Sequence, residues 1–350
     1  MAAVTQQVSW DALVSTTLKN YTPKIEDNLF TNVTLLYWLK EAGHIEKVNG
    51  GEQIVEPLLY EANDTVGAYA GYDNILTTPQ DGITSAVYDW KQYAVSVAIS
   101  GLEEAKNRGE SAVVSLLKAK VDQAEMSLMD GMNKMFYGVI GSQDPAKVWN
   151  GLPSLIQAAA KGSQTISPGG ISSANVDASG NRWWENQYKN IGTAAGEAGQ
   201  FKIADLSSIY NSCSNGRIHP DFILTSQQMW ERYESLLQPQ LRYQSTKAAD
   251  AGFENLLYKS APIMWDAPLS NPANSGSATL GNNSKMYFLN SKFLKLKVHS
   301  DVWLKSTPFE KPHGQDARYS QILCYGNLVT NNRRYLGVLN QEDDVTPKTV

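Results

Sequence analysis

The stretch E-S-A-V-V-S-L-L-K-A-K-V-D-Q-A-E-M-S-L-M-D-G-M-N-K-M-F-Y, residues 110–137, has the strongest structural signal in the sequence. Its apolar residues recur at intervals of three and four, which places them on one face of an α-helix. At about 1.5 Å per residue, about 28 residues span about 42 Å. The pattern therefore predicts one long, continuous helix whose apolar stripe consists of Val114, Leu117, Val121, Ala124, Leu128, Met132 and Met135.

The segment before this helix predicts a long two-stranded projection. Residues 53–60 are one strand candidate, interrupted by Pro57, and strict alternation over residues 93–100 indicates a second strand. Residues 61–85 between them are rich in Gly, Asn, Asp, Thr and Tyr and have no helical period. A connection of this length is uncommon inside a compact domain, and an isolated hairpin is marginally stable in water. We therefore expect the projection to rest on a partner surface.

The remaining chain predicts short elements of both kinds. The apolar run 35–39, closed by Gly43, has two interpretations, a short buried helix or an arm that docks on a neighbouring subunit. Ser100 and Glu103 form a candidate capping box. Residues 160–200 indicate loops anchored by Trp183 and Trp184, and residues 285–339 are rich in strand signals. Further strands are expected at 222–224 and 262–265, a helix at 226–237, a loop at 266–284 and a frayed tail after 340.

Composition excludes several classes of protein. The chain has 350 residues, of which 42% are hydrophobic and 10% aromatic, which excludes a disordered chain. Its formal net charge of −5 argues against a dedicated nucleic-acid binder. Two cysteines exclude a disulfide scaffold, and no apolar run is long enough for a membrane-spanning helix. The length makes two domains the default expectation, and the N-terminus has no secretory signal pattern, so we expect synthesis in a reducing cytoplasm.

Motifs for catalysis are missing from the sequence. It contains no phosphate-binding glycine loop, no dinucleotide fingerprint and no nucleophile elbow. The four histidines never fall within four residues of one another, so no metal-ligand spacing occurs. We therefore expect no catalytic residue, no metal and no cofactor. An acid pair that only folding brings together remains an alternative, with a strongly perturbed carboxylate in a deep pocket as its signature. An adhesion module would predict internal repeats, and the sequence has none.

Lys295, Lys297 and His299 alternate with Leu294, Leu296 and Val298. This basic strand face has two interpretations. It could lie against phosphate groups, since backbone neutralisation requires only cationic side chains. Alternatively, it is an exposed strand face whose lysines discourage pairing at a sheet edge.

The order of these segments resembles the major capsid proteins of tailed phages with the HK97-like fold, an α+β fold. The resemblance covers nearly the whole chain. It depends on Gly51 and on T-L-K-N-Y (17–21), L-L-Y-W-L-K (35–40), I-V-E-P-L-L-Y (54–60), G-Y-D (71–73), T-P-Q-D-G-I-T (78–84), W-W (183–184), L-Q-P-Q (237–240), A-D-A-G-F-E-N (249–255), Y-F-L-N (287–290) and residues 315–334.

The resemblance implies a division of the chain into the segments of that fold. It implies an N-terminal arm at 1–45, an extended E-loop and its base at 46–100, and the spine helix of the peripheral (P) domain at 101–149. It further implies the axial (A) domain at 150–284, and return strands of the P domain with C-terminal strands of the A domain at 285–350.

The resemblance also implies a function. Hexamers and pentamers of the chain would assemble into the icosahedral shell of a virion around packaged double-stranded DNA, which they would contact non-specifically. Assembly would take place in the host cytoplasm with a portal protein, with room for a decoration protein and without a membrane. The basic strand face of Lys295, Lys297 and His299 could then face the lumen of the shell. The alternative is an encapsulin-like nanocompartment shell around a cargo enzyme. Candidate intersubunit residues are the large aromatics Trp10, Trp38, Tyr69, Tyr72, Trp183 and Trp184, for which burial within the subunit is the alternative.

Two departures from the best-known family member carry further expectations. The chain begins almost directly with the arm, so we expect a separate scaffolding protein. Some members crosslink subunits through a lysine of the E-loop, but no lysine occurs between Glu52 and Trp90, and Lys91 would lie at the base of the loop. We therefore expect no covalent mesh of this kind.

Overall fold

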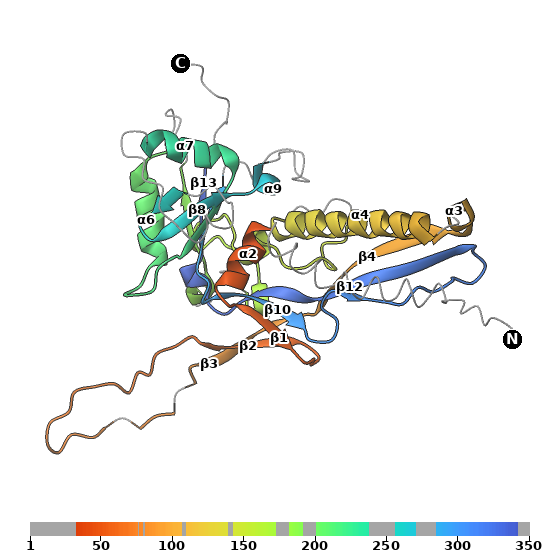
Figure 1. The fold of residues 1–350 in the computed structure, drawn as a ribbon. Coiled ribbons are helices and arrows are strands. Elements are labelled where there is room, and N and C mark those ends of the chain that lie inside the picture. The colour runs from red at the N-terminus through yellow and green to blue at the C-terminus, as the bar shows by residue number, and fades with distance from the viewer. Residues whose placement is uncertain are drawn as a thin grey trace.

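The computed structural model describes residues 33–341, except 76, 80, 107–109, 139–142, 173–181, 192–200, 238–255 and 271–284, and except the side chains of 104–106, 110–118 and 270. The fold has an elongated half, a compact half and a thin projection that extends away from both (Figure 1). The predictions that involve residues 1–32 and 342–350, Trp10 and the C-terminal tail among them, lie outside the described residues.

The elongated half is built from one helix lying along two long strands. Helix α4 (Glu110–Phe136) runs beside β4 (Lys91–Ser100), which pairs in antiparallel register with β12 (Ala317–Thr330) (Figure 1). The predicted long helix is thus confirmed, because it is 27 residues long and its stripe is buried at Val121, Ala124, Leu128, Met132 and Met135.

The predicted capping box is also present, at the start of the short helix α3 (Gly101–Lys106). The backbone N–H of Glu103 donates to Ser100 Oγ over 3.3 Å, and the backbone N–H of Ser100 donates to the Glu103 carboxylate over 3.1 Å. The same carboxylate accepts a hydrogen bond from Lys120 Nζ at 2.7 Å, and this bond is the main reason why the pKa of Glu103 is lowered. The corner between β4 and α3 is thereby attached to α4.

Strand β12 organises the larger of the sheets on this side. Its first part pairs with β4 and its last residues pair with β10 (Leu294–His299), which in turn pairs in parallel with β1 (Ile45–Val48). The short β11 (Lys305–Ser306) lies on β12 as well. One strand of 14 residues therefore connects the far end of the ribbon to the centre of the molecule.

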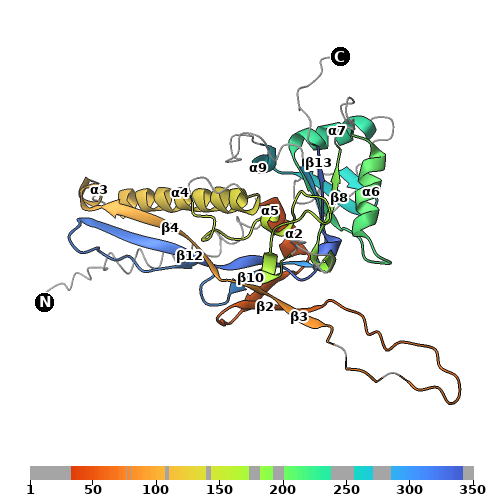
Figure 2. The same ribbon diagram turned by 180° about the vertical axis from the view of Figure 1, so that it is seen from behind.

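The compact half is a six-stranded mixed sheet in the order β5-β13-β9-β6-β8-β7 (Figure 2). Helix α6 (Ile203–Cys213) packs on β5 and β13, and α7 (Gln227–Leu237) packs on β8. The strands expected at 222–224 and 262–265 and the helix expected at 226–237 are confirmed as β6, β8 and α7. The strands are β5 (Gln187–Asn190), β6 (Phe222–Thr225), β7 (Leu256–Tyr258), β8 (Ala261–Trp265), β9 (Lys285–Leu289) and β13 (Gly337–Asn340).

The two halves share one hydrophobic core around helix α2 (Thr34–Glu41). Leu35, Leu36 and Leu39 are fully buried, and the Trp38 ring stacks on Phe222 of β6 with the ring centroids 4.9 Å apart. Of the two interpretations of the run 35–39, the structure therefore confirms the buried helix.

A buried carboxylate reinforces this junction. Asp266, which immediately precedes the short helix α9 (Ala267–Ser270), accepts hydrogen bonds from Tyr137 Oη at 2.8 Å and from Asn133 Nδ2 at 3.0 Å. Burial raises the pKa of Asp266, and the hydrogen bonds of Tyr137, Asn133 and Thr34 act in the opposite direction. The compact half is thus bonded to the C-terminal end of α4 as well as packed against α2.

The pairing inside the projection differs from the prediction. Strand β2 (Ile54–Leu59) pairs with β3 (Ile83–Tyr88), which the sequence analysis placed in the connecting loop, whereas the alternating stretch 91–100 joins the other sheet as β4. Alternation indicates a strand but contains no information about its partner. Pro57 does not interrupt β2, because a two-stranded sheet has free edges where a missing N–H costs no ladder bond.

The described residues between α4 and β5 are mostly loop with short helical turns, and loops were expected from residue 160 onward. These turns are α5 (Leu152–Leu155), η1 (Pro168–Gly170) and η2 (Arg182–Trp184). A fourth turn, η6 (Arg333–Tyr335), follows β12 and contacts η2.

The side chain of Arg333 holds these turns together. It is fully buried, and its guanidinium donates to Leu155 O and Trp184 O, each at 2.8 Å. It also donates to Asn186 Oδ1 at 2.8 Å and to Gln164 Oε1 at 3.1 Å. Burial lowers the pKa of Arg333 to about 10, so the group stays charged at pH 7. Four acceptors from three separate places along the chain are therefore bonded to one cation.

We predict that Arg333→Met lowers the free energy of unfolding by about 3 kcal/mol or more, because it removes four buried hydrogen bonds and leaves the carbonyl oxygens of Leu155 and Trp184 without this donor. Urea unfolding at pH 7, followed by tryptophan fluorescence, measures the change. The neighbouring Arg334, which is exposed, provides the matched control, and Arg334→Met should change the same quantity by less than about 0.5 kcal/mol. Equal losses for the two variants would contradict the role of Arg333.

Candidate functional site

The projection, residues 54–88, concentrates exposed apolar side chains. Of the eleven large hydrophobic residues that are exposed in the described part of the chain, seven lie in it. A soluble monomer seldom exposes such a row of apolar groups unless they belong to an interaction site. The seven are Val55, Leu59, Val66, Tyr69, Tyr72, Ile75 and Ile83.

The tip segment, residues 60–82, extends beyond the paired strands (Figure 1). Tyr60 closes its base by donating from Oη to Asp81 O at 2.7 Å, and Asp73 accepts the backbone N–H of Ala70 at 2.9 Å in a local turn. Tyr72 is fully exposed and Tyr69 is 66% exposed. The tip segment therefore offers aromatic surface that the rest of this chain does not cover.

By contrast, the base of the projection is firmly held. The buried Tyr88 donates from Oη to Thr330 O of β12 at 2.7 Å, and burial raises its pKa well above the ordinary value. Gly169 of η1, with φ +69°, lies so close that an added Cβ would be 2.5 Å from the Cβ of Ala86. Only glycine combines this backbone conformation with such a close approach. The turn η1 thereby clamps strand β3.

A column of aromatic rings continues this clamp. Tyr60 stacks on Trp183 with the ring centroids 5.3 Å apart, and Trp183 packs on Trp184 at 5.6 Å. Trp184 is buried and donates from Nε1 to Pro168 O at 3.0 Å. The start of the tip segment therefore rests on the turns that Arg333 holds.

A buried ion pair attaches β2 to the five-stranded sheet that contains β10 and β12. Lys297 of β10 contacts Glu56 of β2, and only 13% and 5% of the two side chains are exposed. Glu46 pairs with Lys297 at 3.3 Å and with Lys295 at 2.7 Å, and is 39% exposed. Burial tends to lower the pKa of Lys297, but the hydrogen bonds and charges of Glu56 and Glu46 together raise it. Burial tends to raise the pKa of Glu46, but the two lysines together lower it.

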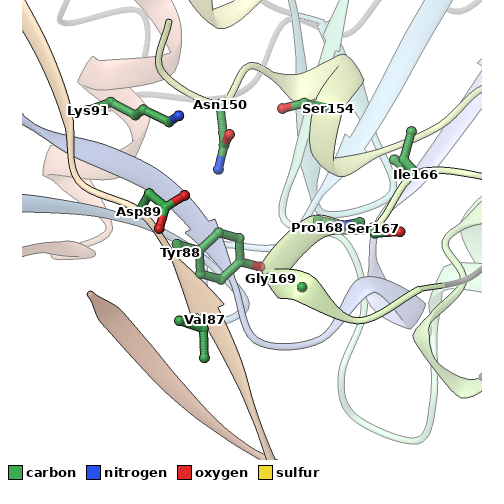
Figure 3. Close-up of a pocket in the computed structure, with 11 residues that line it drawn as sticks. Val87, Tyr88, Asp89, Lys91, Asn150, Ser154, Ile166, Ser167, Pro168 and Gly169 are labelled. Carbon is green, nitrogen blue, oxygen red and sulfur yellow. The ribbon is translucent and has the colours of Figure 1, made fainter. Parts of the chain in front are cut away.

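A cavity of about 380 Å³ lies between the base of the projection and the turn η1. Figure 3 shows Asp89 and Lys91 on one side and Ser154, Ile166 and Ser167 on the other. Its charged groups already have structural partners, because Asp89 accepts a hydrogen bond from Gln53 at 2.9 Å and Lys91 donates to Ala146 O. The residues that line this cavity include no histidine or cysteine, and Asp89 is its single acid.

Among the described residues no group of three or more His, Cys, Asp or Glu side chains could hold a metal ion. In the same part of the chain, no helix has the length and apolar character needed to cross a membrane.

The structure separates the candidate aromatic residues into two groups. Trp38 and Trp184 are buried within this chain, which is the alternative that the sequence analysis left open. Trp183 is half-buried, and Tyr69 and Tyr72 are exposed on the tip segment. The tip segment thus remains available to a second molecule, and so does the part of Trp183 that Tyr60 and Trp184 leave exposed.

The structure changes the interpretation of the basic strand. Strand β10 is not at an edge, because β1 and β12 flank it, so the lysines have no edge to protect. Lys295 and Lys297 are both engaged with carboxylates, and His299 lies edge-on to the ring of Trp90, with the centroids 5.7 Å apart. Orientation toward a lumen remains a prediction for these three residues.

Three buried polar residues escaped the sequence analysis. Arg333, Asp266 and Glu56 hold the base of the projection or the junction of the halves, yet no catalytic or metal-ligand spacing in the sequence distinguishes any of them. Only Glu56 could have been recognised from the sequence, because it is a charged residue in an otherwise apolar strand, at a position that alternation assigns to the buried face.

We predict that Lys297→Met lowers the free energy of unfolding by about 3 kcal/mol, because it leaves the buried Glu56 carboxylate without its cation. Lys295→Met is the matched control, and its cost should stay below about 1 kcal/mol because its partner Glu46 is partly solvated. Urea unfolding at pH 7 distinguishes the two variants. A loss for Lys295→Met as large as that for Lys297→Met would show that burial does not decide the strength of these pairs.

No protein-family model matches the chain, and no curated protein matches it either. Solved structures do match over most of their length. The structure described as the cyanophage A-1(L) capsid asymmetric unit has a TM-score of 0.57 at 16% identity, over 86% of this chain and 92% of that one. A protein of Gordonia phage Cozz has a TM-score of 0.52 at 10% identity, over 87% of this chain and 86% of that one.

A third similar structure comes from a different kind of container. The holo-SrpI encapsulin complex from Synechococcus elongatus PCC 7942 has a TM-score of 0.50 at 12% identity, over 89% of each chain. The similarity in all three cases is one of fold, because the sequences have diverged to 16% identity or less. The chain has the α+β HK97-like fold, which phage capsid and encapsulin shell proteins share.

Proposed function

We propose that this chain is the major capsid protein of a tailed phage, which assembles as hexamers and pentamers into an icosahedral shell around double-stranded DNA. The observation that carries the proposal is the projection, which is rigidly held at its base and exposes a row of apolar residues along its length. Such a segment gains stability only where another molecule covers it. The fold that the chain shares with a cyanophage capsid protein supports the same function.

In this proposal the segments take the roles of the HK97-like capsid fold. Residues 1–45 form the N-terminal arm, and residues 46–100 form the E-loop with its base. Residues 101–149 contain the spine helix of the P domain, and residues 150–284 form the A domain. Residues 285–350 return to the P domain and end in strands of the A domain. The course of α4 and the position of the projection agree with these assignments (Figure 1).

The chain acts in this proposal as a structural protein of the virion, assembled in the host cytoplasm, and not as an enzyme. The DNA inside would be contacted weakly, since a chain with net charge −5 does not retain a polyanion strongly. A scaffolding protein, a portal protein and a decoration protein remain predictions from the resemblance.

An encapsulin-like nanocompartment is the second candidate function. The fold shared with the SrpI encapsulin supports it at a TM-score of 0.50. The two candidates differ in the content of the particle, which would be a cargo protein in a nanocompartment and packaged DNA in a virion.

We predict that the purified chain forms closed icosahedral shells, or rings of five or six subunits, because the projection must be covered by other copies. Negative-stain electron microscopy with light scattering over a range of concentrations measures this. Mass spectrometry and nuclease treatment of particles from the native source then identify the content. A monomer of 38.5 kDa under every condition, including addition of lysate from the producing cell, would contradict the proposal.

We also predict that Tyr69→Ser combined with Tyr72→Ser lowers the yield of assembled particles at least about tenfold, because large aromatic residues dominate the energy of protein interfaces. The melting temperature of the free subunit should stay unchanged, since both side chains are exposed in the monomer. Ile203→Ser, which removes an exposed apolar residue from α6, is the control and should assemble like the unmodified chain. Full assembly of the double tyrosine variant would remove the tip segment from the interface.

A further inference from the structure

Charge is distributed unevenly between the projection and the rest of the chain. Residues 48–90 contain seven carboxylates and no Lys, Arg or His. This segment therefore contributes −7 to a chain whose net charge is −5, so the remaining residues together carry +2. The body and the projection have opposite signs, which is the condition for attraction between the projection of one copy and the body of another. The seven acids are Glu52, Glu56, Glu61, Asp64, Asp73, Asp81 and Asp89.

The acids differ in what they contact within the chain. Glu56 is buried against Lys297, and Asp89 accepts a hydrogen bond from Gln53 at the base. Asp64 and Asp73 lie along the tip segment and are exposed, and Asp73 contacts only the local backbone among the contacts described above. The outer part of the tip segment therefore combines negative charge with the exposed rings of Tyr69 and Tyr72.

The body carries a surface of complementary character beside the base of the projection. Lys161, Arg182 and Arg334, here called the root cations, are all exposed. They belong to adjacent turns, because η2 contacts η6 and an added Cβ at Gly162 would lie 3.5 Å from Arg182 Nη2. The half-buried ring of Trp183 lies next to Arg182 in the same turn.

The acid that follows Trp184 in the sequence, Glu185, is directed to partners inside the chain. Glu185 is buried and accepts a hydrogen bond from the backbone N–H of Gly162 at 2.8 Å. Its charge is balanced by the buried Arg333, and Glu185 in turn acts to raise the pKa of Arg333. Among the described residues of these turns, 161–164, 182–186 and 332–335, the exposed charges are therefore all positive. Arginine and tryptophan are also the side chains that most often anchor protein interfaces, and cations pack favourably on tyrosine rings.

We propose that the acidic outer part of the tip segment docks on the root cations and Trp183 of a neighbouring copy of this chain. This inference rests on the proposed shell function and specifies which surfaces meet. The tip segment and the surface of the root cations are different parts of the chain, so a contact between them is heterologous. Repeated around an axis, it generates a closed ring, because each copy offers its tip to one neighbour and its root to the other.

A charge exchange between the two surfaces tests this contact. The tip variant combines Asp64→Lys with Asp73→Asn. The asparagine at position 73 retains the side-chain oxygen that accepts the backbone N–H of Ala70. The root variant is Lys161→Glu with Arg334→Glu, and the control is Lys292→Glu with Lys305→Glu, two exposed cations elsewhere on the body. The yield of rings and shells at about 50 mM and about 500 mM salt is compared by light scattering and electron microscopy.

We expect the tip variant and the root variant each to lower the yield at least about tenfold at low salt, and a chain with both sets of changes to recover to within about threefold of the unmodified protein. The control should assemble normally. Unchanged assembly of the tip variant, or no recovery when the changes are combined, would overturn the inference. In either case normal shells from the unmodified chain would leave the proposed function intact.

Disulfide trapping provides a measurement that does not depend on yield. Asp73→Cys and Lys161→Cys are combined in one chain, and oxidation of assembled particles should produce a ladder of covalent multimers on non-reducing gels. The two native cysteines are both buried, so they do not contribute readily to such a ladder. Each single-cysteine variant should show no ladder. A ladder no stronger in the combined variant than in the single ones would place the tip elsewhere on the neighbour.

Discussion

The position of the projection depends on one buried cation. The Arg333 guanidinium satisfies acceptors of Leu155, Gln164, Trp184 and Asn186, and so converts a long stretch with little regular structure into a fixed support. On that support Gly169 closes on β3 and Trp183 stacks under Tyr60. A desolvated charge is costly, and it is tolerated because the guanidinium is hydrogen-bonded to four acceptors, two of them the backbone carbonyls of Leu155 and Trp184.

A firm base with an uncovered tip has a mechanical consequence for assembly. Because Tyr88 is bonded to β12 and Glu56 is paired with Lys297 of β10, the base of the projection is fixed to the five-stranded sheet before any contact at the tip is made. Ordering the tip segment then costs only its own local entropy. In a closed shell each subunit has several neighbours at once, so contacts that are weak in pairs become sufficient together.

The fold persists across very different sequences because its constraints are mostly geometric. A 27-residue helix must lie along a ribbon, and one strand must extend from that ribbon into the centre of the molecule. Any apolar residues with the right period meet these demands. Polar contacts such as Asp266 with Tyr137 and Asn133 then fix how the two halves meet. The sequence of this chain is 16% or less identical to those of shell proteins with the same fold, which agrees with a fold whose constraints are mostly geometric.

The sequence by itself determined the local elements whose periodicity is strong. Helix α4, the alternation of β4 and β10, the capping box at Ser100 and Glu103, and the presence of a long connection without helical period could all be predicted, because each depends on neighbours within a few residues. The tertiary structure alone decided that β2 pairs with β3 and that β4 joins β12. Period-2 alternation indicates which face of a strand is buried but not which strand lies beside it.

The difference between local and long-range contacts also explains which parts of the candidate site could be predicted from the sequence. The exposed tyrosines of the tip segment were recognisable, because a long aromatic loop has no local means of burial. The roles of Arg333, Glu56 and Lys297 were not, because each depends on a partner more than 100 residues away. The burial of Trp38 and Trp184 was equally hidden, since an aromatic residue in a sequence has the same identity whether it faces its own core or a neighbour. Long-range packing makes that choice.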